Sequence, residues 1–129
     1  MPFVVYILHC SGISRDAIER QVRVYCTPDR REPFSVWLDR LRDARAGQKI
    51  QARIGRLRLG NLGDARRVGD GVCELRIDYG PGYRVYFGQD GPVVIILLSG
   101  GDKTTQSADI RVAKRYWDAY RQEKHDANR

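Results

Sequence analysis

The chain has few of the residues that build metal sites and histidine-based active sites. Its three cysteines are widely spaced with no Cys-x-x-Cys pair, and His9 and His125 lie near opposite ends of the sequence. This spacing matches no zinc-ligand pattern and argues against a catalytic histidine pair, so we expect neither a metal nor a cofactor. Reduced thiols are typical of a reducing compartment, which indicates a cytoplasmic protein.

Long apolar runs are also missing. The runs at 3–8 and 93–98 are each too short to span a bilayer, and the first is too short for the core of a signal peptide. We find no internal repeat and no low-complexity tract. A chain of 129 residues is long enough for one domain with a sizeable core.

Negative charge is scarce relative to positive charge. Lysine and arginine number 23 against 16 aspartates and glutamates, which gives a formal net charge of +7, and most of the cations are arginines. Such an excess favours a nucleic acid as the partner, or an acidic protein that covers a nucleic-acid site. Charge alone does not choose between these two.

Hydrophobic periodicity predicts a small α+β domain. Strands are expected at 22–26, 74–79, 83–87 and 93–98, and helices at 33–44, 48–59 and 106–123. Gly47 would separate the first two helices, which would form a helical hairpin. Residues 60–71 would form a glycine-rich loop. Residues 99–103 would lead the chain out of the last strand. The strands would meander into a small antiparallel, twisted sheet with the helices to one side.

Three segments divide the sequence. Residues 1–20 would be an N-terminal extension, either with an added edge strand at 3–8 or with little structural contribution. Residues 21–123 would form the domain, and residues 124–129 would be a frayed tail.

A predicted hairpin at 74–87 carries the most information. Apolar and polar residues alternate along both of its strands, so one face would be apolar and the other polar. The polar face would include Arg76, Asp78, Arg84 and Tyr86. With a loop of three residues at 80–82, Arg76 would face Tyr86 and Asp78 would face Arg84. This open face suits a phosphate backbone or a carboxylate-rich partner, but it is equally typical of a solvated surface with an ion pair.

Several motifs together resemble the RelE/ParE toxin superfamily of bacterial toxin–antitoxin modules. Within it the chain is most similar to the phage Gp49-like or HigB-like branch, the addiction module killer proteins. The matching motifs are Phe34–Asp43, Arg56–Asp64, Glu74–Arg76, Gly80–Phe87 and Gly100–Gln106 with Asp109–Ile110. They cover about residues 22–120, so the resemblance implies a RelE-like fold for nearly the whole domain.

The resemblance also implies a toxin that enters the ribosomal A site and cleaves mRNA with a cluster of basic residues. The positions that match this cluster are Arg76, Arg84 and Lys103. A cognate antitoxin, often a helix-turn-helix protein in this branch, would cover the basic face. RelE itself has a tyrosine for proton transfer near the position of Asp109. The identity of the general base therefore stays open between Asp109 and Tyr86. Asp109 could instead cap the last helix.

Cleavage of RNA without a metal uses the 2′-OH as nucleophile on the adjacent phosphate, and negative charge gathers on the phosphoryl oxygens. Arg76 and Arg84 would orient the phosphate and stabilise that charge, and Lys103 would add a second charge or donate a proton. Further cations would contact ribosomal RNA without sequence preference, or stay solvated. These are Lys49, Arg53, Arg56, Arg66 and Arg67.

Two other functions stay open on the sequence. A ParE-like poison of DNA gyrase would share the fold and trap DNA breaks. A degenerate toxin would be inactive and would serve only to bind the antitoxin. The cluster of Arg76, Arg84 and Lys103 favours the nuclease.

Overall fold

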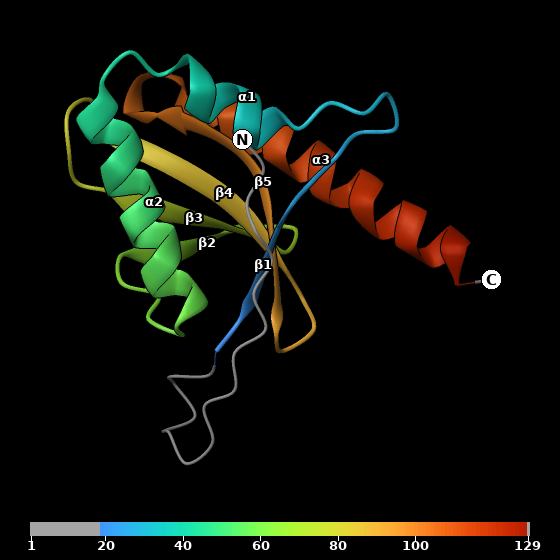
Figure 1. Ribbon diagram of the computed structural model, residues 1–129. Helices are drawn as coiled ribbons and strands as arrows, with labels where there is room; N and C mark the ends of the chain where they lie inside the picture. Colours follow the sequence, from blue (N-terminus) through green and yellow to red (C-terminus); the bar gives the residue numbers. More distant parts are fainter. Residues whose placement is uncertain (1–18, 129) are drawn as a thin grey trace.

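Five strands form one sheet in the computed structural model, which describes residues 19–128 (Figure 1). In chain order the elements are β1 (Gln21–Val24), α1 (Pro33–Arg40), α2 (Ala44–Arg58), β2 (Ala65–Gly69), β3 (Val72–Ile77), β4 (Tyr83–Asp90), β5 (Val94–Asp102), the short 3₁₀ helix η2 (Lys103–Thr105) and α3 (Gln106–Ala127). The α+β class is therefore as predicted. The edge strand expected at 3–8 lies outside the described residues.

The sheet is mixed, with the strand order β1-β5-β4-β3-β2. Strands β2 to β5 form the predicted antiparallel meander, but β1 pairs in parallel with β5, and Gln21 lies opposite Val94. The prediction of a purely antiparallel sheet was wrong at this one edge. No local sequence pattern indicates this pairing, because it joins two strands at opposite ends of the domain.

Helices cover both faces of the sheet, not one face as predicted. The cause is visible in β5, where four successive apolar residues, Ile95 to Leu98, are buried. Their side chains alternate between the faces, so each face needs its own cover. Ile95 and Leu97 pack in the cluster with α1 and α2, whereas Ile96 and Leu98 pack in the cluster with α3.

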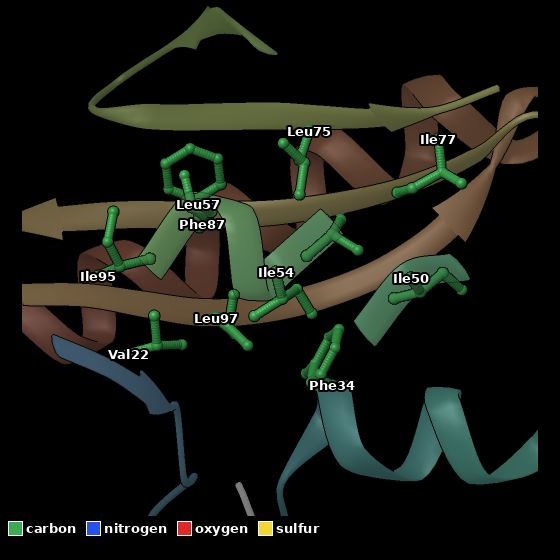
Figure 2. Close-up of a cluster of buried hydrophobic side chains, with 11 residues drawn as sticks. Val22, Phe34, Ile50, Ile54, Leu57, Leu75, Ile77, Phe87, Ile95 and Leu97 are labelled. Atoms are coloured by element: carbon green, nitrogen blue, oxygen red, sulfur yellow. The ribbon is translucent and has the colours of Figure 1, made fainter. Parts of the chain in front are cut away.

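The first cluster is shown in Figure 2. Phe34 of α1 and three residues of α2, Ile50, Ile54 and Leu57, pack there against apolar side chains of β3, β4 and β5. Figure 1 shows α3 extending beyond the sheet toward the C-terminus. No helix within residues 19–128 is long and apolar enough to cross a membrane.

The boundary between α1 and α2 lies earlier than predicted. Pro33 occupies the first turn of α1 as expected, but that helix ends at Arg40. The Asp43 carboxylate then accepts the backbone N–H groups of Arg45 and Ala46 at 2.9 and 3.3 Å, which caps α2. Gly47 therefore lies inside α2 and does not break the helix.

Three other boundaries differ from the prediction. Part of the expected loop at 60–71 is strand β2, which turns into β3 through Asp70 and Gly71, both with positive φ. An Asp-Gly pair of this kind is a known hairpin signal. Strand β5 continues through 99–102 without leaving the sheet. Helix α3 continues to Ala127, so residues 124–127 are not frayed.

Both tryptophans lie flat on strand glycines, on opposite faces of the sheet. A Cβ atom at Gly88 would lie 2.3 Å from Trp117 Cε3, and one at Gly100 would lie 2.2 Å from Trp37 Cε3. Trp117 also stacks on Tyr120 with an interplanar angle of 8°. Trp117 belongs to the cluster on the α3 side of the sheet and Tyr120 packs against that cluster, and Gly88 and Gly100 provide the space that the two indole rings occupy.

Candidate functional site

The hairpin of β3 and β4 has a different register from the one predicted. Ile77 pairs with Tyr83, Arg76 with Arg84 and Glu74 with Tyr86, a shift of two positions. The shift arises because the turn begins early: the N–H of Tyr79 donates to the Ile77 carbonyl at 2.9 Å, so residues 78–82 all belong to the connection. A shift of two keeps every side chain on its predicted face.

The three residues predicted as catalytic line one cavity. Arg76 of β3, Arg84 of β4 and Lys103 of η2 surround an open space of about 370 Å³ beside the turn at 80–82. A Cβ atom at Gly82 would lie 3.5 Å from both Arg84 Nη1 and Lys103 Cβ, so the turn backbone passes close to the Arg84 guanidinium and to the base of the Lys103 side chain. The structure therefore brings together side chains from three elements.

Two carboxylates also line this cavity, and the sequence analysis did not select either of them for a role. Asp64 precedes β2, and Asp78 begins the β3–β4 connection; both are exposed. The cavity thus presents three cations and two carboxylates. The position of Asp78 on the predicted polar face, two residues after Arg76, is the signal that could have identified it.

The polar face of the hairpin is not open as predicted. Glu74 and Tyr86 are fully buried, and Tyr86 packs in the cluster beneath α3. Tyr86 Oη donates a hydrogen bond to Glu74 Oε2 at 3.2 Å, and Gln106 Nε2 of α3 donates to the same oxygen at 2.8 Å. The N-terminal turn of α3 therefore closes this part of the sheet from solvent.

Three arginines surround the buried Glu74 carboxylate. Its Oε1 lies 3.2 Å from Arg76 Nε, 3.7 Å from Arg66 Nε and 3.9 Å from Arg84 Nε. Burial by itself raises the pKa of Glu74, but the hydrogen bonds from Gln106, Arg76 and Tyr86 and the charge of Arg84 outweigh it and lower the pKa below its ordinary value. Glu74 is therefore an anion at neutral pH.

Arg84 is more enclosed than an open sheet face would allow. The residue is 9% exposed, and its Nε is buried without a hydrogen-bond partner, at a distance from Glu74 that is too long for such a bond. Its Nη1 donates to the Tyr83 carbonyl at 3.5 Å. The prediction of an open polar face is therefore wrong at Arg84, because only part of its guanidinium reaches the cavity.

Tyr86 and Asp109, the two predicted proton-transfer residues, do not line the cavity. Burial, together with the charge and hydrogen bond of Glu74, raises the pKa of Tyr86 far above its ordinary value, so this phenol stays protonated. Asp109 lies in the first turn of α3 and accepts a hydrogen bond from Thr105 Oγ1; burial raises its pKa. Asp109 therefore does not cap the helix. A role for Tyr86 or Asp109 in proton transfer stays a prediction.

Asp109 also packs against the backbone of β5. A Cβ atom at Gly101 would lie 1.9 Å from Asp109 Oδ2, so only glycine fits at this position. Gly101 pairs with Arg84 in the β4–β5 ladder. The carboxylate of Asp109 therefore packs over the β5 residue that lies opposite Arg84 in the sheet.

Among the cations predicted to contact RNA, Arg53 has a structural role. Its Nη2 donates to the backbone carbonyls of Leu62 at 3.2 Å, Asp64 at 3.4 Å and Arg76 at 3.5 Å. Burial and the nearby Arg56 lower its pKa. The guanidinium of Arg53 thereby joins α2 to the segment before β2 and to β3, next to the cavity.

The remaining RNA-contact candidates are exposed and lie on two elements. Lys49 and Arg56 belong to α2, and Lys49 Nζ lies 5.1 Å above the ring of Tyr79. Arg66 and Arg67 belong to the edge strand β2, not to a loop as predicted. Contact of these residues with RNA stays a prediction.

A second cavity of about 530 Å³ lies at the C-terminal half of α3. Its lining includes Trp117, Tyr120, Arg121, Lys124 and His125. Within the described part of the chain, no three histidine, cysteine, aspartate or glutamate side chains are grouped so that they could hold a metal ion.

Comparison with known proteins identifies a bacterial relative. No family model matches the chain, and no solved structure matches it. An uncharacterized protein of Haemophilus influenzae (strain Rd) is 56% identical over 81 residues, which cover 63% of this chain and 82% of that protein. This degree of identity over most of the relative implies a common fold and descent. The chain therefore belongs to the same family as the Haemophilus influenzae protein.

Proposed function

We propose that the chain is the toxin of a type II toxin–antitoxin module, a ribosome-dependent endoribonuclease that cleaves mRNA without a metal. One observation carries this proposal: Arg76, Arg84 and Lys103, which match the basic cluster of RelE/ParE toxins, line a single open cavity. We further propose that the sheet and its helices are a RelE-like domain, with β1 as the parallel edge strand.

The geometry of the cavity fits a phosphodiester. Arg76 and Lys103 are the more accessible cations, and Arg84 lies deeper beside the turn. Charged donors on several sides of one phosphate would stabilise the negative charge that develops on its oxygens when the 2′-OH attacks, at a few kcal/mol for each well-placed donor. Arginine suits this role because its planar fork matches two phosphoryl oxygens.

Proton transfer in this scheme falls to groups at the cavity or on the ribosome. Asp64 and Asp78 line the cavity and are the carboxylates that a bound 2′-OH would meet there. Lys103 would protonate the leaving 5′-oxygen. The cavity is shallow and holds no histidine, so the ribosome and the bound codon would supply the remaining orientation.

The partners follow from the same proposal. A cognate antitoxin, a helix-turn-helix protein in this branch, would cover the cationic cavity and neutralise the toxin. The exposed cations of α2 and β2, Lys49, Arg56, Arg66 and Arg67, would contact ribosomal RNA. The toxin would act in the cytoplasm, where ribosomes and mRNA are present.

The test is to express the chain without an antitoxin and to map mRNA 5′ ends. We expect growth arrest and new ends within translated codons. Lys103→Ala should reduce cleavage at least 10-fold, because it removes one cation from the reacting phosphate. Lys124→Ala, which removes a cation from the far end of α3, is the matched control and should leave cleavage unchanged.

The alternatives predict different outcomes. Intact mRNA with an induced DNA-damage response would identify a gyrase poison. Absence of toxicity together with tight antitoxin binding would identify an inactive binding module. Full cleavage by Lys103→Ala would refute the assignment of the cavity even if the toxin is a nuclease.

A further inference from the structure

A buried carboxylate lies beneath the cationic cavity, and the proposed chemistry does not use it. Glu74 has no exposed side-chain surface, yet its Oε1 is shared by three arginines whose side chains are exposed to different degrees: 58% for Arg66, 27% for Arg76 and 11% for Arg84. Arg76 and Arg84 also line the cavity. One anion therefore contacts both arginines of the proposed site from below.

The other oxygen of this carboxylate is fixed by neutral donors. Gln106 Nε2 of α3 and Tyr86 Oη of β4 both donate to Glu74 Oε2, at 2.8 and 3.2 Å. Neither donor carries a charge, so they hold the carboxylate in place without competing with the arginines for its charge. The arrangement leaves Oε1 directed at the guanidinium groups.

We infer that Glu74 is a positioning residue of the proposed nuclease: its buried carboxylate holds the guanidinium groups of Arg76 and Arg84 in one arrangement at the cavity. This inference rests on the proposed function. Arginine has many rotamers, and donors stabilise a transition state best when their positions are set before the reaction. A fixed anion shared by two arginines sets both positions together.

The charge of Glu74 should affect RNA binding in the opposite direction to its effect on cleavage. A negative charge beneath the cavity reduces its attraction for a phosphate backbone. Removing the charge should therefore strengthen, or leave unchanged, the binding of RNA while it disorders the arginines and slows cleavage. A residue with a purely structural role would weaken binding and cleavage together, so the signs of the two effects separate the roles.

The experiment compares Glu74→Gln with the full-length wild-type chain on ribosomes that carry a defined mRNA. We expect the cleavage rate at saturating ribosome concentration to fall about 10- to 100-fold, because misplaced donors cost that much. The half-saturating ribosome concentration should stay the same or decrease. Asp90→Asn, which removes another paired carboxylate at the far end of β4, should change neither quantity.

A second measurement does not depend on activity. In the free protein, the ¹⁵Nε–¹H NMR signals of Arg76 and Arg84 should be resolved in the wild type and should shift or broaden in Glu74→Gln. If Glu74→Gln does not fold, Gln106→Ala takes its place, because Gln106 is only partly buried at the start of α3 and does not line the cavity. That variant should show the same changes with a rate loss of about 5-fold, as expected for one hydrogen bond.

The outcomes are separate for the two proposals. A folded Glu74→Gln protein with unchanged arginine signals and an unchanged cleavage rate would overturn the role of Glu74, as would a rate loss with binding weakened in parallel. If Gln106→Ala must be used, wild-type signals in that variant would overturn it. A wild-type protein that cleaves no mRNA would refute the proposed function, whereas the NMR comparison would still show whether Glu74 orders the arginines.

Discussion

Replacing Gly88 with alanine should destabilise the fold by about 1–3 kcal/mol, the usual cost of overpacking a filled core. The new Cβ would lie 2.3 Å from Trp117 Cε3 and 2.5 Å from Cδ2 and Cζ3. Carbon atoms in ordinary contact are about 3.5–4.0 Å apart, so the ring or the strand would have to move by more than about 1 Å. The ring has little freedom to move, because it stacks on Tyr120 with ring centroids 5.3 Å apart.

Gly47→Ala is the matched control for this prediction. A Cβ at Gly47 would meet no atom within 4 Å, and the residue lies inside α2. Alanine is more favourable than glycine in a helix, so the same substitution should stabilise the fold by about 0.5–1 kcal/mol. The two variants therefore change the free energy of unfolding in opposite directions.

Urea unfolding followed by tryptophan fluorescence measures both effects. The emission of the folded Gly88→Ala protein should also shift, because Trp117 would change its surroundings, whereas that of Gly47→Ala should match the wild type. A Gly88→Ala protein within about 0.5 kcal/mol of the wild type, the range of ordinary surface substitutions, would refute the proposed fit between ring and strand.

Three further predictions concern particular contacts. Arg53→Ala should lower the free energy of unfolding by about 1–3 kcal/mol, because it leaves backbone carbonyls without their donor, whereas the exposed Arg56→Ala should be nearly neutral in the same denaturation assay. Burial and the hydrogen bond to Asp90 raise the pKa of Tyr120 to about 12, so the stability from this phenol is complete below pH about 10 and is lost as the pH rises through about 12. A phenolate absorbance titration compared with Tyr120→Phe tests this, and a transition near pH 10 for Tyr120 would contradict it. Hydrogen bonds from Lys124 and Tyr120 lower the pKa of Asp90, so its contribution is present above pH about 3.9 and is lost as the pH falls through its folded value. Asp90→Asn should therefore flatten the acid limb of a stability profile, and an unchanged limb would argue against the pairing.

The sequence was most informative where periodicity alone decides the structure. The alternation in β3 and β4 identified Leu75, Ile77, Val85 and Phe87 as one apolar face, and all four are buried in the same cluster. Two cations of the candidate site could also be predicted, because the alternation places Arg76 and Arg84 together on the opposite face. Their position beside Lys103 depends on the turn at 80–82 and on η2, which periodicity does not determine.

Other features depended on contacts between distant segments. The hairpin register required the early turn at Tyr79, which no pattern of apolar residues encodes. The burial of Glu74 required knowledge that the first turn of α3 covers that face, and Gln106 makes this contact across a long stretch of sequence. The local pattern could place Glu74 among cations, but it could not distinguish a solvated charge from an enclosed one.

The parallel pairing of Gln21 with Val94 has a consequence for synthesis of the protein. Strand β1 leaves the ribosome early, whereas its hydrogen-bonding partner is translated near the end of the domain, so the nascent chain cannot complete its sheet until β5 has emerged. Lys103 follows β5 directly. A product terminated before Val94 therefore lacks both the strand that joins β1 to the sheet and the third cation of the cavity, and incomplete translation yields a fragment without a formed site.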